Sequence, residues 1–283
     1  MQGSLLFEER QMMDRMNAQQ TPLIELNQAE VVRAGKMILH VDDFSLPQGE
    51  HIAILGPNGA GKSTFVKLIT REVMPLYKDE PPVRFMGNPR ALLTDVRKKL
   101  GIVSSTMQAQ VNVHLPAVEI VEGGLFGTLG LPRHVQPTEL THEKALQAMD
   151  MLGVVDLAER DIMTMSTGQA RRVLIARALV HEPDTLLLDE PCTGLDPEGT
   201  YYVRSAMRKL AQAGKGIVLI THYPEDIIPE IQRVLLIKGG SVHADGTKDA
   251  LLTSDVMSGL FEVPLKVARN GENNEYFSLV SDY

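Results

Sequence analysis

A glycine-rich segment places the strongest constraint on what this chain can fold into: Gly56-Pro57-Asn58-Gly59-Ala60-Gly61-Lys62-Ser63-Thr64. The apolar run His51–Leu55 before it is typical of a buried strand, and residues 62–70 after it favour a helix. Glycines let backbone N–H groups converge on phosphate oxygens, and a helix N-terminus adds partial positive charge. The segment therefore predicts a strand, a phosphate-binding loop (P-loop) and a helix in direct succession.

Acidic residues further along the chain suit the same chemistry. Lys62 can reach the β- and γ-phosphates of a nucleotide, and the Ser63 hydroxyl can hold Mg²⁺. In the run Thr185 to Glu190 (TLLLDE), Asp189 ends an apolar strand and would support the Mg²⁺ shell, while Glu190 suits a general base for an attacking water. Alone, the two acids could equally cap a strand; beside a P-loop the catalytic interpretation is favoured.

Strand and helix patterns around these motifs indicate an α/β fold. Apolar runs at 185–189, 216–220 and 234–237 alternate with helical segments, which implies a parallel sheet covered on both faces. Residues 22–39 suggest an antiparallel hairpin, and the Gly239-Gly240 pair a closing hairpin. The segment of about 107–165 is mostly helical in pattern. We expect a P-loop NTPase core with a parallel sheet, an antiparallel β subdomain and a helical insert.

Composition narrows the functional class. The 283 residues carry a formal net charge of -8, which disfavours a nucleic-acid partner. The single cysteine, Cys192, excludes an intramolecular disulfide framework, and we interpret it as a packing residue. The N-terminal residues lack an apolar signal core, and no run is long enough to span a bilayer. We therefore expect a cytoplasmic protein that reaches a membrane only through a partner.

One further motif carries a family resemblance. Met165-Ser166-Thr167-Gly168-Gln169 and the helical run after it resemble the signature LSGGQ of ATP-binding-cassette (ABC) ATPases, and the likeness covers about residues 22–250. From the residues alone, Ser166 followed by Gln169 predicts a capping box at a helix start. The resemblance implies ATP and Mg²⁺ as ligands and a head-to-tail homodimer, in which Ser166 to Gln169 act on the opposite subunit's γ-phosphate.

Two more positions match the family. Asp196, in Gly194-Leu195-Asp196, resembles the D-loop at the dimer interface, and with Pro197 it also suits a helix cap and first turn. His222 follows the strand at 216–220 and resembles the histidine that contacts the γ-phosphate.

Three positions depart from the family pattern. Thr167 stands where glycine is usual, so its side chain is expected to narrow the approach and slow closure. Ser105 takes the expected Q-loop glutamine position, and Gln108 is a candidate replacement at the metal, although it suits a surface position equally well. No aromatic ring precedes the first hairpin turn, where Arg33 could stack on adenine or simply be solvated.

These expectations converge on an ATPase that hydrolyses ATP and energises a membrane permease on the cytoplasmic face. A soluble regulatory or assembly ATPase is the alternative, and an ATP-sensing scaffold is disfavoured by Glu190 and His222. A stretch at 121–131 resembles ATPases of molybdate and iron-complex uptake. Residues 1–21 are predicted to form a tail, 22–283 the ATPase domain, and about 251–283 a C-terminal extension in which the run 261–267 suggests a strand-rich tail.

Overall fold

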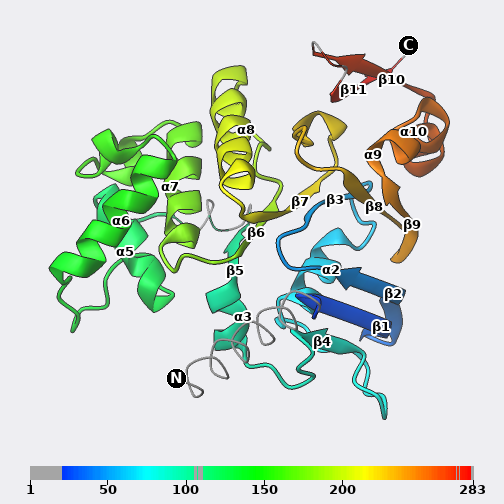
Figure 1. Cartoon of the computed structure of the whole chain (residues 1–283), viewed down its shortest axis with the longest axis horizontal. Coiled ribbons are helices and arrows are strands. Elements are labelled where there is room, and N and C mark those ends of the chain that lie inside the picture. Colours follow the sequence, from blue (N-terminus) through cyan, green and yellow to red (C-terminus); the bar gives the residue numbers. More distant parts are fainter. Residues whose placement is uncertain (1–20, 105–106, 108–110, 272, 274, 282–283) are drawn as a thin grey trace, which may run out of the picture.

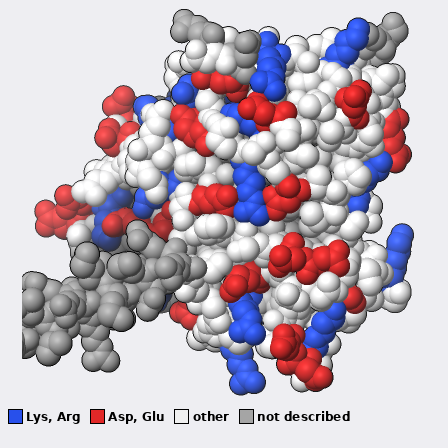
Figure 2. Space-filling view, turned by 45° about the vertical axis from the view of Figure 1, so that its right-hand side comes forward, with Lys and Arg blue, Asp and Glu red and all other residues white. Residues whose placement is uncertain are grey.

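The structure is a computed structural model, and it describes residues 21–104, 107, 111–271, 273 and 275–281. Ser105, Gln108 and nearly all of the expected N-terminal tail lie outside these residues. Among the residues described, no helix is both long and apolar enough to cross a membrane. On the face shown in Figure 2, acidic and basic side chains are interspersed. Such local charge pairing is illustrated by Arg233, which bonds both Glu50 and Asp245.

A nine-stranded sheet forms the centre of the molecule, in the order β4-β1-β2-β9-β8-β3-β7-β6-β5. Its β8, β3, β7, β6 and β5 run parallel, whereas β4-β1-β2 and β8-β9 pair antiparallel (Figure 1). The strands are β1 Ile24–Arg33, β2 Lys36–Leu46, β3 His51–Leu55, β4 Val83–Phe85, β5 Leu100–Val103, β6 Thr185–Asp189, β7 Gly216–Thr221, β8 Arg233–Lys238 and β9 Ser241–Thr247.

Helices lie against this sheet and beside it. In Figure 1, α5, α6 and α7 form a group to the left of the sheet, and α8 stands between that group and β6. The predicted fold class, with its parallel core, antiparallel strands and helical insert, is confirmed. The helices are α2 Lys62–Ile69, α3 Leu93–Lys99, α5 Ala117–Gly123, α6 Glu139–Met151, α7 Thr167–Leu179, α8 Pro197–Gln212, α9 Lys248–Leu251 and α10 Ser254–Phe261, with short 3₁₀ turns η1 Gly124–Phe126, η2 Val155–Leu157, η3 Ile162–Thr164 and η4 Pro224–Asp226.

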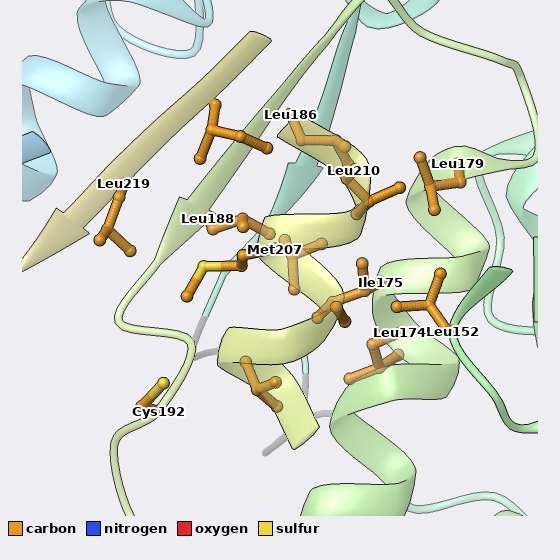
Figure 3. Close-up of a cluster of buried hydrophobic side chains, with 14 of the residues drawn as sticks. Leu152, Leu174, Ile175, Leu179, Leu186, Leu188, Cys192, Met207, Leu210 and Leu219 are labelled. Atoms are coloured by element: carbon orange, nitrogen blue, oxygen red, sulfur yellow. The ribbon is translucent and has the colours of Figure 1, made fainter. Parts of the chain in front are cut away.

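Side chains of the central strands alternate between two hydrophobic cores, one on each face of the sheet. In β3, Ala53 and Leu55 join one core while Ile52 and Ile54 join the other, and all four are buried. Because successive side chains of a strand point to opposite faces, a continuous apolar run needs cover on both. Figure 3 shows the first core, where Met207 and Leu210 of α8 lie between Leu186 and Leu188 of β6 and the side chains of α7.

The C-terminal segment differs in part from the sequence expectation. A strand pair does form, β10 Leu265–Asn270 with β11 Tyr276–Ser281. However, Phe261 ends α10 rather than beginning a strand. Thr253 caps that helix by accepting from the Val256 backbone N–H, and Glu262 terminates it with a left-handed φ of 61°. The pattern of 261–267 missed this because the helix is specified by its cap, which lies outside that run.

Candidate functional site

The glycine loop occupies the carboxyl end of β3, between β7 and β8 in the parallel part of the sheet. Gly59 and Gly61 adopt φ of 79° and 107°, which strain any residue with a Cβ. A Cβ at Gly56 would overlap the backbone carbonyl oxygen of Ile237 in β8. The loop is anchored from outside, since the Gly240 N–H donates to the Ala60 carbonyl at 2.9 Å. Tight packing and backbone strain therefore explain the glycines that the sequence places there.

Lys62 begins α2 and turns back into this loop. Its Nζ donates to the carbonyls of Gly56 at 2.6 Å and Pro57 at 3.2 Å, and the residue is buried. Burial lowers the pKa of Lys62, and the negative charges of Glu190 and Asp189 oppose that change. The ammonium group thus lies among phosphate-loop carbonyls and within the field of both predicted acids.

Asp189 ends β6, which lies two strands away from β3 in the sheet, and Glu190 follows it. Burial raises the pKa of Asp189, and the neighbouring Glu190 charge raises it further. Binding a cation would offset the cost of burying the Asp189 charge. Together with the Ser63 hydroxyl, this carboxylate offers the hard oxygen ligands that Mg²⁺ prefers. The described residues hold no cluster of three or more His, Cys, Asp or Glu side chains suited to a metal. This donor set fits Mg²⁺, which takes few protein ligands and completes its shell with waters and phosphate oxygens.

His222 and Glu190 contact each other directly. The His222 Nδ1 lies 3.0 Å from the Glu190 Oε1, and the two side chains are 17% and 22% exposed. Glu190 has a left-handed φ of 52°, and its backbone N–H donates to the carbonyl of Ile220 at 2.8 Å. The His222 ring also contacts the Tyr223 ring, with centroids 3.9 Å apart and the ring planes tilted by 44°. Adjacent parallel strands β6 and β7 therefore bring the two residues together, 32 positions apart in the chain.

Ser166 and Asp196 begin neighbouring helices. The Ser166 Oγ accepts from the Gln169 N–H at 3.2 Å and the Gln169 Oε1 accepts from the Ser166 N–H at 3.0 Å, so the predicted capping box on α7 is confirmed. Asp196 caps α8 by accepting from the Gly199 N–H at 2.8 Å, which confirms its predicted capping role. A Cβ at Gly168 would lie 2.8 Å from the Gly199 Cα. The signature segment therefore packs backbone to backbone on the helix after the Asp196 loop.

The remaining candidate residues are either exposed or outside the described part of the chain. Arg33 is exposed at the end of β1 and is followed by a turn in which Ala34 has a φ of 48°. Thr167 is exposed in the first turn of α7. Gln108 and Ser105 lie outside the described residues.

Sequence reasoning missed two residues near His222. The Tyr223 ring contacts the His222 ring, and the buried Asp226 accepts a hydrogen bond from Thr221, the residue before His222. The only signal in the sequence was a polar run following an apolar strand, Thr221-His222-Tyr223-Pro224-Glu225-Asp226.

Comparison with known proteins agrees with this geometry. Residues 39–193 match the ABC transporter family. The chain is 30% identical over 250 residues to the uncharacterized ABC transporter ATP-binding protein YlmA of Bacillus subtilis, covering 88% of this chain and 94% of that protein. It is 38% identical over 216 residues to the cobalt import ATP-binding protein CbiO of Rhodobacter capsulatus, covering 75% of each.

A solved structure shows the same fold. The dimeric post-hydrolysis structure of the ATP-binding cassette MJ0796, bound to ADP and Pi, superposes with a TM-score of 0.63 at 26% identity, covering 79% of this chain and 98% of that one. The family match, the relatives and the fold together lead to one conclusion: the chain belongs to the ABC transporter family and is an ATP-binding subunit of that family.

Proposed function

We propose that the chain hydrolyses ATP to ADP and phosphate, with Glu190 as the general base. The observation that carries this is the 3.0 Å contact between Glu190 and His222 at the edge of the sheet that also holds the P-loop. Water attacks the γ-phosphorus, the bond to the ADP oxygen breaks, and the Glu190 carboxylate takes the water's proton. His222 holds that carboxylate and contacts the γ-phosphate.

The other site residues position and neutralise charge. Backbone N–H groups of residues 56–64, other than Pro57, surround the phosphates. The Lys62 ammonium moves from its loop carbonyls onto the β- and γ-oxygens. Ser63 and Asp189 would hold Mg²⁺, which would neutralise negative charge on the phosphates. In this proposal Gln108 adds a further contact to the metal and Arg33 stacks on adenine.

We further propose that two copies form a head-to-tail dimer, in which Ser166 to Gln169 and Asp196 of one copy complete the other copy's site. The dimeric MJ0796 cassette supports this arrangement. The dimer energises a membrane permease from its cytoplasmic face, and the relative named for cobalt import supports a transport role over a soluble regulatory one. A specific hydrolysis rate that stays constant on dilution would contradict the dimer.

Glu190→Gln tests the general base. Loss of the proton acceptor is expected to lower ATP hydrolysis about 10²-fold or more while ATP binding persists. Phosphate release and light scattering should show an inactive, ATP-stabilised dimer. The control Glu182→Gln removes an exposed carboxylate that pairs with Lys144 and should keep wild-type turnover. Unchanged turnover in Glu190→Gln would refute the assignment.

A further inference from the structure

A buried carboxylate lies beneath the loop that carries His222, and the proposed reaction does not use it. Asp226, the last residue of η4, is 2% exposed. Its Oδ2 accepts from the Thr221 Oγ1 at 2.9 Å, and its Oδ1 accepts from the Arg204 guanidinium of α8 at 2.8 Å. Both oxygens are therefore engaged. Burying a charge costs free energy unless the charge is paired. The Asp226 carboxylate therefore depends on these two partners, and it holds both of them in place.

The Thr221 hydroxyl links the Asp226 carboxylate to the backbone on the far side of His222 through two hydrogen bonds. While donating to Asp226, the Thr221 Oγ1 accepts from the Tyr223 backbone N–H at 3.0 Å. The residue before His222 and the residue after it are thus joined through one hydroxyl. Because the His222 Cα lies between these two fixed points, the loop closes into a rigid turn that directs the imidazole toward Glu190.

The same carboxylate also borders the segment that carries Glu190. Cys192, two residues after Glu190, is buried beside Asp226 and Arg204, and burial with the Asp226 charge raises the pKa of its thiol to about 12. A neutral thiol lets this loop pack against the ion pair without adding charge. Asp226 therefore touches both chain segments whose side chains meet in the Glu190–His222 contact.

The neighbouring glutamate provides a contrast within the same short turn. Glu225 faces the other way, and its Oε1 accepts from the Leu279 backbone N–H of β11 at 2.6 Å. One turn further along α8, Arg208 pairs with Glu230 at 3.0 Å, just as Arg204 pairs with Asp226. Glu230 accepts hydrogen bonds from Arg208 and Gln212, both on α8, so this pair shows what an ion pair to α8 does by itself.

We propose that Asp226 is a positioning residue for ATP hydrolysis, which through Thr221 fixes His222 against Glu190. This inference rests on the proposed roles of Glu190 and His222. A catalytic group displaced by about 1 Å can cost about 10²-fold in rate, so a relay of two hydrogen bonds is sufficient to matter. Neither Asp226 nor Thr221 needs to touch the nucleotide, and the effect should therefore fall on kcat rather than on binding.

The test compares two isosteric changes with a matched control. Asp226→Asn replaces one acceptor oxygen by a donor amide, and Thr221→Val removes only the hydroxyl. Each should lower kcat about 10-fold or more, with KM and the Kd for ATP within about 2-fold of wild type. Thr221→Ser keeps the hydroxyl and should restore kcat. Glu230→Gln breaks the neighbouring ion pair and should leave kcat unchanged even if the melting temperature falls.

Separate outcomes overturn the inference and the proposed function. A wild-type kcat in Thr221→Val, or equal losses in Thr221→Val and Thr221→Ser, refutes the positioning role whether or not Asp226→Asn folds. Equal losses of kcat in Glu230→Gln and Asp226→Asn would reduce Asp226 to a general structural ion pair. His222→Ala is measured alongside: wild-type turnover in that variant would overturn the proposed role of His222 itself, independently of Asp226.

Discussion

The helices α2 and α7 both begin at motifs that we propose bind phosphate, but their first turns are built differently. Gly61 precedes α2, and glycine has no side chain with which to accept from first-turn N–H groups. Ser166 precedes α7, where it and Gln169 form a capping box within the chain. Helix starts leave four backbone N–H groups without intrahelical partners. The first-turn N–H groups of α2 are thus left for a ligand. In α7, by contrast, the Ser166 side chain already accepts from one of these groups.

The P-loop and the signature segment also differ in how they contribute to the stability of the fold. At the P-loop, Gly59 and Gly61 take left-handed conformations, and both Lys62 and Asp189 have pKa values displaced by burial in the direction that disfavours their charged forms. At the signature segment, Ser166 and Gln169 make local hydrogen bonds that stabilise the fold without a ligand. Replacing the Asp189 carboxylate by a neutral group should therefore stabilise the nucleotide-free protein, whereas removing the Ser166 cap should destabilise it.

The largest effect is expected at Gly56. Gly56→Ala places a Cβ onto the Ile237 carbonyl oxygen, so β8 or the loop must shift, at a cost of about 3 kcal/mol or more. Urea unfolding would measure this loss, and ATP binding should fall with it. Gly259→Ala in α10 is the control, because nothing lies within 4 Å of its Cβ and a helical alanine should be neutral or stabilising. Equal stability in both variants would contradict the packing argument.

A smaller effect is expected at Ser166. Ser166→Ala removes the cap of α7 and should lower the free energy of unfolding by about 1 kcal/mol. The same loss is expected for Thr138→Ala, because Thr138 and Thr141 form an equivalent capping box on α6. Only Ser166→Ala should also slow ATP hydrolysis, through the partner's site. Matching hydrolysis rates in the two variants would break the assigned role of the signature segment while leaving its capping role intact.

The smallest effect on stability, and one of opposite sign, is expected at Asp189. Its folded-state pKa is raised, so its contribution to stability is fully present below the unfolded pKa and is lost as pH rises through the folded pKa. Asp189→Asn should therefore stabilise the nucleotide-free protein at pH 8, and the gain should shrink as pH falls through the raised folded-state pKa toward the ordinary carboxyl pKa of 3.8. Denaturant unfolding across this range measures it.

Asp161→Asn is the matched control, because its effect on the free energy of unfolding should have the opposite sign. A hydrogen bond from His114 holds the pKa of Asp161 below its ordinary value, so its loss should destabilise the protein at neutral pH. Destabilisation by Asp189→Asn at pH 8 would show that its contacts outweigh the cost of burial. Hydrolysis should fall in the Asp189 variant and persist in the Asp161 variant.

The two helix starts also show how far sequence alone could reach. The P-loop succession and the Ser166–Gln169 box were predictable because both depend on residues within a few positions of one another. The predicted strand began at residue 261, but Phe261 still belongs to α10, which begins after the cap at Thr253. Helix boundaries set by distant caps are poorly specified by a short window.

What the sequence by itself determined is the set of local motifs: a glycine loop that needs φ above zero, acids that end an apolar strand, and a serine that starts a helix. Only the tertiary structure decided which motifs meet. Parallel pairing of β6 with β7 brings Glu190 to His222 across 32 positions, and Asp226 reaches Arg204 across 22. The physical reason is that local conformation follows neighbouring residues, whereas contacts between strand ends follow the order of the sheet.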